Sequence, residues 1–161
     1  MNDIRPLHAP KPRSTTVRNI AWLYAGVLTV MAVGQLFSFE KFTPFIDSYW
    51  LPGGHGTGML VACLIVITEV FALPFLLRMD LSPLMRWFSL VCSALVPLLW
   101  LSILLFEMST HWILLNSGLF GTKVAIPSGM GAVTLVVILL GLAAVSIWGL
   151  WPLYKKTAVK K

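Results

Sequence analysis

Four long apolar segments are the feature of this sequence that most restricts the fold. They cover residues 20–37, 58–77, 87–106 and 131–151. A helix needs about 20 consecutive apolar residues to cross the hydrocarbon core of a bilayer, which is about 30 Å thick. Only 11% of the 161 residues are charged and 58% are hydrophobic, whereas about 25% of the residues in a soluble domain are charged. A soluble globular domain is therefore excluded, and the sequence predicts an all-α integral membrane protein: an antiparallel four-helix bundle.

The distribution of lysine and arginine predicts the orientation of the spans, because cytoplasmic loops carry an excess of these residues. Ten of the twelve precede the first span, separate the second and third, or follow the fourth, and Lys41 and Lys123 are the exceptions. We therefore expect a multi-pass protein of the bacterial cytoplasmic (inner) membrane with both termini in the cytoplasm. Residues 1–19 are expected to form a disordered cytoplasmic lead, residues 20–152 the membrane domain, and residues 153–161 a basic cytoplasmic tail.

The connection between the first two spans is rich in aromatic residues, which favour the membrane–water interface. Its apolar residues recur at helical spacing, at Phe42, Phe45, Ile46 and Tyr49. The sequence therefore predicts a short interfacial helix after the first span, which ends before Pro52.

One acidic residue, Glu69, lies in the middle of the second apolar segment. An acidic or basic residue at the centre of a membrane helix costs about 2.5–3.5 kcal/mol on insertion scales, and such residues usually face the interior of the bundle. A neutral carboxyl group there can donate one hydrogen bond and accept others. The polar side chains that the other spans offer as partners are Gln35, Ser93, Ser102 and Thr134.

Two roles for Glu69 follow from this position. The first is a structural clasp, because polar side chains often hold membrane helices together by hydrogen bonds. The second is the transfer of a proton or a contact with the headgroup of a quinone, with Gln35 beside it. Trp100, which lies near the centre of the third span, is expected to face lipid or a partner helix.

The order of several motifs resembles the DoxX-like superfamily, and most closely its methylamine-utilisation MauE-like family. In that pattern a lysine follows the first span, an aromatic–x–Leu–Pro sequence closes the loop, and a glutamate lies within the second span. The matching residues are Lys41, Tyr49, Leu51, Pro52 and Glu69. The resemblance extends over roughly residues 20 to 150 and includes the four-span architecture.

The segment NSGLFG, residues 116–121, lies where MauE-like proteins often carry Cys-Gly-Cys-Phe-Gly between the third and fourth spans. Gly118, Phe120 and Gly121 match this pattern. Ser117 and Leu119 replace the two cysteines, and a thiol relay requires a thiolate nucleophile. We therefore expect no dithiol chemistry here, and a turn whose glycines allow close packing.

Three residues near the outer ends of the spans could bind a metal in principle. Glu107 and His111 are four residues apart, and His55 or Asp47 of the other outer loop could join them in a site of mixed nitrogen and oxygen ligands. This spacing matches no zinc motif. The favoured interpretation is a hydrogen-bonded interfacial pair, so we expect no metal and no catalytic residue.

The resemblance, combined with the replaced dithiol and the lack of a set of cofactor ligands in the sequence, leads us to expect a non-catalytic membrane subunit, or an assembly or maturation factor, of a redox enzyme complex. Its partners would be membrane lipids and other membrane or periplasmic redox subunits, and not nucleic acid. The alternative is a quinone-linked membrane oxidoreductase subunit with a pocket around Glu69, for which quinone would be the cofactor. A proton-coupled carrier would also suit the acid, but the spans show no inverted repeat.

Overall fold

The computed structural model describes residues 12–47, 55–110, 117–121, 124, 126–127 and 129–151. Its four long helices are α1 (Thr15–Phe37), α3 (His55–Leu76), α4 (Pro83–Thr110) and α5 (Met130–Leu150), and the short helix α2 (Phe39–Asp47) follows α1. All four long helices have the length and the apolar composition needed to cross a membrane. The predicted all-α fold with four spans is therefore confirmed, and the chain is a multi-pass membrane protein.

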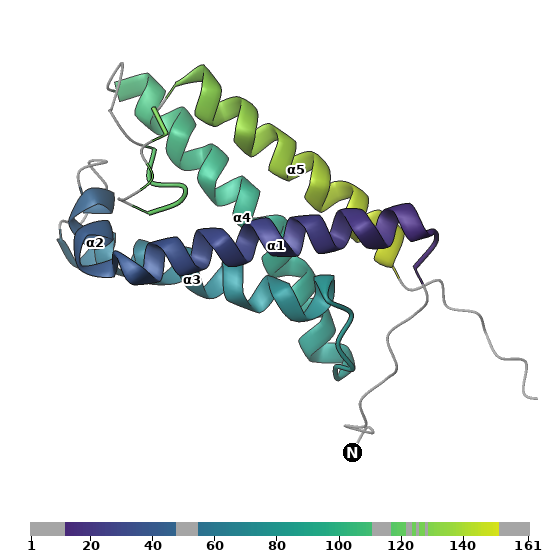
Figure 1. Ribbon diagram of the computed structural model, residues 1–161. Coiled ribbons are helices and arrows are strands. Elements are labelled where there is room, and N and C mark those ends of the chain that lie inside the picture. Colours follow the sequence, from purple (N-terminus) through teal and green to yellow (C-terminus); the bar gives the residue numbers. More distant parts are fainter. Residues whose placement is uncertain are drawn as a thin grey trace, which may run out of the picture.

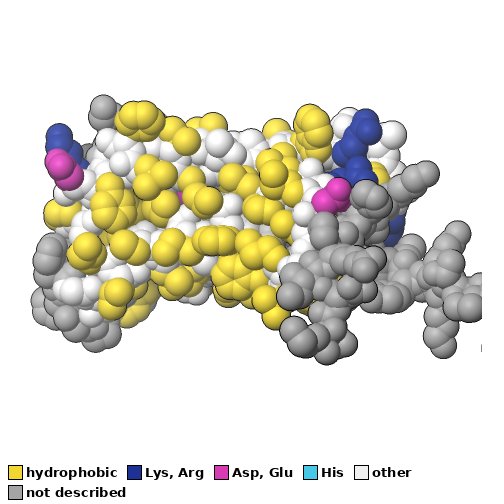
Figure 2. Space-filling model, turned by 90° about the horizontal axis from the view of Figure 1, so that it is seen from below, with side chains coloured by type: hydrophobic (Ala, Val, Ile, Leu, Met, Phe, Trp, Pro, Cys, Tyr) yellow, Lys and Arg dark blue, Asp and Glu magenta, His cyan; other side chains and the backbone are white. Residues whose placement is uncertain are grey.

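The four long helices form a closed antiparallel bundle (Figure 1). α1 packs against α3, α3 against α4, α4 against α5, and α5 against α1. The two ends of the described chain meet at one end of the bundle, where the N–H of Arg13 donates to the carbonyl of Gly149 at 3.2 Å. The face shown in Figure 2 is mostly hydrophobic, and the charged side chains lie near its two ends. This pattern suits a bundle surrounded by acyl chains and bounded by two polar surfaces.

Three of the helices, α1, α3 and α4, begin at least three residues before the apolar segments that predicted them. α1 begins at Thr15, because the hydroxyl of Ser14 accepts a hydrogen bond from the N–H of Val17 at 3.2 Å and caps the first turn. Residues 15–19 are therefore helical, and the prediction that they belong to a disordered lead was wrong. α4 begins at Pro83. A proline is tolerated at the first position of a helix, because the N–H that it lacks would have no acceptor within the helix. Residues 1–11 and 152–161, which include the basic tail, lie outside the described residues.

The short helix α2 occupies the place predicted for an interfacial helix. Its side chains Phe42 and Ile46 are fully buried, and it packs mainly against α3. The described part of this helix ends at Asp47. Tyr49, Leu51 and Pro52, which carry part of the family resemblance, lie outside the described residues.

Pro97 interrupts the hydrogen bonds of α4, and α1 supplies the missing donor. A proline has no N–H, so the carbonyl four residues earlier, that of Ser93, loses its helical partner. The hydroxyl of Tyr24, a fully buried residue of α1, donates to this carbonyl at 2.8 Å. Tyr24 and Pro97 lie on two different helices, so this hydrogen bond fixes α1 against α4 across the bundle.

A second hydroxyl group enters α3 close to its own proline, Pro74. The side chain of Ser89 on α4 accepts from the N–H of Phe75 at 2.9 Å and donates to the carbonyl of Phe71 at 2.6 Å. It thereby bridges a donor and an acceptor that would pair directly in a regular helix. Both prolines inside the membrane-spanning helices, Pro74 and Pro97, thus have a polar side chain from another helix nearby, as expected for membrane helices.

We predict that Tyr24→Phe destabilises the protein by about 1–3 kcal/mol, because the carbonyl of Ser93 is left buried without a donor. In a Pro97→Ala background the same substitution should cost clearly less, because the N–H restored at position 97 can donate to that carbonyl. Reversible unfolding in detergent micelles measures both costs. An equal cost in the two backgrounds would show that Tyr24 does not compensate for Pro97.

Candidate functional site

The carboxyl group of Glu69 lies at the centre of a polar cluster inside the bundle. Its side chain is fully buried. Oε1 accepts a hydrogen bond from Nε2 of Gln35 at 3.0 Å and another from Nε1 of Trp100 at 3.2 Å. These donors belong to α1 and α4, and Glu69 itself belongs to α3. A single carboxyl oxygen therefore connects three of the four spans.

Each of the three side chains belongs to the buried face of its own helix. On α1, Gln35 continues a buried stripe that is formed by Tyr24, Leu28 and Met31. The buried stripe of α3 includes Ile65 and Ala72 on either side of Glu69, and that of α4 includes Val96 and Leu104 around Trp100. Because side chains three or four residues apart share a helix face, packing of the apolar neighbours also brings the polar groups together.

The loop after α4 is part of the same cluster. Nε2 of Gln35 donates a second hydrogen bond to the carbonyl of Leu119 at 3.1 Å. The side chains of Leu119 and Ser117 are both fully buried. Since two acceptors flank the same terminal atom of Gln35, that atom is the amide nitrogen. The loop at residues 117–121 therefore enters the end of the bundle, where the hydrogen bond from Gln35 to Leu119 holds it.

Two glycines allow this close approach of loop and helix. A Cβ atom on Gly34 of α1 would lie 2.6 Å from the carbonyl oxygen of Phe120, and one on Gly121 would lie 2.5 Å from the carbonyl oxygen of Gly34. Gly121 also has a φ of 77°, which strains any other residue. These contacts give a physical reason for a glycine at position 121, which is one of the positions that match the MauE-like pattern. Phe120, beside it, packs against the core.

Two oxygen atoms of the cluster have no hydrogen-bond partner among the described residues. They are Oε2 of Glu69 and Oε1 of Gln35, and both are buried. An unsatisfied buried acceptor costs about 1–3 kcal/mol. The cluster is therefore able to accept further donors, which a proton on the acid, a water molecule or the hydroxyl group of a bound molecule would supply.

The partners of Glu69 agree only in part with those that the sequence suggested. Gln35 contacts it, whereas the hydroxyl groups of Ser93, Ser102 and Thr134 donate to carbonyls of their own helices. Trp100 was expected to face lipid or a partner helix. It is fully buried, and its indole N–H donates a hydrogen bond to Glu69. A buried indole N–H usually needs a hydrogen-bond acceptor, and this requirement could have identified Trp100 as a partner of Glu69.

The structure describes only some of the remaining candidate residues. Lys41 is exposed on α2 beside Glu40, and Glu107 is buried near the end of α4. The side chain of His55 and the whole of His111 lie outside the described residues. Within the part of the chain that is described, no group of three or more His, Cys, Asp or Glu side chains is arranged to hold a metal ion.

We predict that Gly34→Ala destabilises the protein by about 1–3 kcal/mol, because the added methyl group overlaps the backbone of the loop. Gly26→Ala, on the same helix, is the matched control. A Cβ atom there meets nothing within 4 Å, and alanine is favoured over glycine in a helix by up to about 1 kcal/mol. Thermal unfolding measures both, followed in a Cys63→Ser background by the reaction of the buried free thiol of Cys92 with a fluorogenic maleimide. Equal shifts for the two variants would contradict the docking of the loop on α1.

Comparisons of the chain with protein-family models, with curated proteins and with solved structures found no match. The DoxX-like and MauE-like resemblance accordingly rests on the order and spacing of the sequence motifs.

Proposed function

We propose that this chain is a non-catalytic, DoxX/MauE-like membrane subunit, or an assembly or maturation factor, of a redox enzyme complex in the bacterial cytoplasmic membrane. Both termini are then cytoplasmic, and α2 and the loop at residues 117–121 face the outer side. Two features support this orientation. Arg13, Arg78 and Arg86 lie at the end of the bundle where the described chain begins and ends, and Lys41 lies at the opposite end.

The proposal rests on the burial of Glu69 and on the hydrogen bonds that its carboxyl group accepts. A carboxyl group that acts on a substrate must be accessible to it, at least in part of the catalytic cycle. Here the side chain is fully buried, and Oε1 is occupied by donors from two other helices. The geometry supports a clasp that gives the bundle one fixed arrangement, as a scaffold for a partner protein requires.

The loop beside this clasp supports the same conclusion. Ser117 and Leu119, at the two positions that correspond to cysteines in the resembling family, are buried against the bundle. Neither side chain can form a disulfide or act as a thiolate nucleophile. The backbone carbonyl of Leu119 instead holds Gln35. At these two positions, therefore, the loop contributes to packing and not to electron transfer.

A second candidate function is a quinone-linked oxidoreductase subunit, and the two unsatisfied oxygens favour it. Oε2 of Glu69 and Oε1 of Gln35 could each accept a hydrogen bond from a quinol hydroxyl group. Such a ligand would bind at the acid and exchange protons with it. This function requires a carboxyl group at position 69, whereas a clasp requires only a hydrogen-bond acceptor there.

We predict that Glu69→Gln preserves the function of the complex, because an amide oxygen still accepts from Gln35 and Trp100. Glu69→Leu should impair it, because the Trp100 N–H then loses its acceptor at a cost of about 1–3 kcal/mol. The gene is deleted in its host, the membrane complex that is lost is identified on native gels, and each variant is expressed in the deletion strain. The amount of assembled complex and its turnover per complex are then measured.

The results separate the two functions. Wild-type assembly and turnover with Glu69→Gln would support the subunit or assembly factor. Normal assembly with lost turnover and lost bound quinone would support the oxidoreductase instead. If deletion of the gene changed no membrane redox complex, the proposed function would be wrong.

A further inference from the structure

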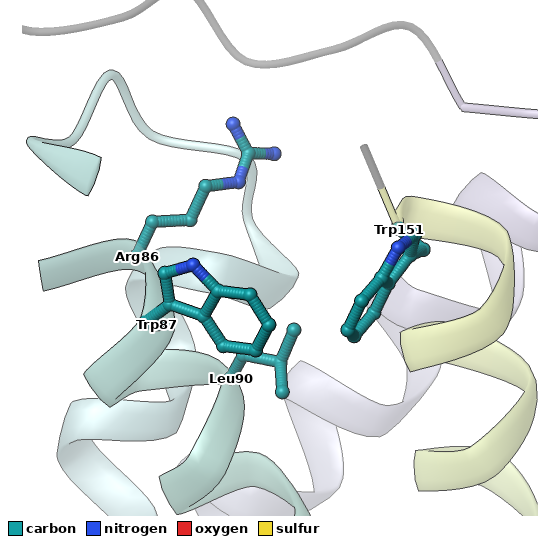
Figure 3. A pocket seen from close by; sticks show the side chains of 4 residues that line it. All are labelled: Arg86, Trp87, Leu90 and Trp151. Carbon is teal, nitrogen blue, oxygen red and sulfur yellow. The ribbon is translucent and has the colours of Figure 1, made fainter. Parts of the chain in front are cut away.

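The end of the bundle where the described chain begins and ends carries a narrow groove between α4 and α5. It is lined by Arg86, Trp87, Leu90 and Trp151, and its cavity volume is about 20 Å³. The two indole rings meet at an angle of 87°, with 5.2 Å between their centroids. Figure 3 shows Leu90 and both rings around the gap and the guanidinium group of Arg86 at its upper edge. The groove thus has apolar walls and a cationic rim.

The cation at this rim has an unused hydrogen-bond donor. Nε of Arg86 is buried and has no acceptor among the described residues. Four more lysines, Lys155, Lys156, Lys160 and Lys161, follow Trp151 in the sequence. An anion bound at Arg86 would supply the missing acceptor in a charge-assisted hydrogen bond.

The groove is placed for a ligand that comes from the bilayer. The side chains of Trp87 and Trp151 are 54% and 41% exposed, so their outer edges lie on the lipid-facing surface of the bundle. Tryptophan favours the level of the lipid headgroups. The gap is too small for a ring system or another helix, and the two rings are in edge-to-face contact. An acyl chain therefore lies across the mouth of the gap, along the exposed edges of Trp87 and Trp151.

We propose that this groove binds one anionic phospholipid. The phosphate group accepts from Nε and the terminal nitrogens of Arg86, and the first part of an acyl chain lies against Trp87, Leu90 and Trp151. Basic pockets between membrane helices are a known type of lipid site. The charge at the rim selects an anionic headgroup over a zwitterionic one. This site lies at a different end of the bundle from the outer loop, and it does not depend on the function proposed above.

The test uses the full chain in nanodiscs of phosphatidylcholine with a small fraction of phosphatidylglycerol that carries a photoreactive group near the start of one acyl chain. Crosslinks are located by mass spectrometry of peptides. We expect them in the segments around Trp87–Leu90 and Trp151, and unlabelled phosphatidylglycerol should compete for them better than phosphatidylcholine. Arg86→Gln should lower this crosslinking about fivefold, because one arginine near the surface contributes about 1 kcal/mol to the binding of anionic lipid.

Arg18→Gln is the matched control, because it removes the same charge at the same end of the bundle from an exposed position on α1. It should leave the crosslinking nearly unchanged. Trp151→Ala keeps the charge and removes one wall of the groove, so it should lower crosslinking around Trp87 even if Arg86→Gln does not fold. Equal losses for Arg18→Gln and Arg86→Gln, crosslinks spread evenly around the bundle, or equal competition by both lipids would overturn the proposal.

Discussion

A carboxyl group inside an apolar bundle needs hydrogen-bond donors, and this requirement organises the structure around Glu69. No water replaces a missing partner in the hydrocarbon region, so each buried polar group must find one within the protein. Trp100 and Gln35 both donate to Oε1 of Glu69, and Gln35 also donates to the loop carbonyl of Leu119. The positions of α1, α3, α4 and the loop are thereby linked through three hydrogen bonds.

The same principle applies at Pro97 of α4, and a related contact lies beside Pro74 of α3. Proline frees a backbone carbonyl, and Tyr24 of α1 satisfies that of Ser93 on α4, while Ser89 of α4 enters α3 next to Pro74. Apolar packing between helices differs little from apolar packing against lipid, so it specifies their arrangement only weakly. The polar contacts therefore do much to define which helix faces which. A bundle held together in this way agrees with the proposed function of a subunit that presents one surface to a partner protein.

Much of the fold could be predicted because lipid imposes a simple rule on sequence. Long apolar segments become spanning helices, and the periodic aromatic residues after the first span formed α2. The ends of the helices were less predictable, because Ser14 and Pro83 extend α1 and α4 beyond the apolar segments. Gln35 was identifiable as a partner of Glu69 because it is a polar residue within a span. The carbonyl of Leu119 was not, because a backbone acceptor has no signature in the sequence and depends on how the loop folds back.

A double-mutant cycle between Glu69 and Trp100 tests the central claim, that their hydrogen bond joins α3 to α4. Glu69→Leu, Trp100→Phe and the double variant are compared with the wild type by reversible unfolding in detergent micelles. The claim predicts that the double variant loses less stability than the sum of the two single losses, by about 1–2 kcal/mol, because residues that share a hydrogen bond are energetically coupled. Losses that add to within about 0.5 kcal/mol, as for independent sites, would contradict it.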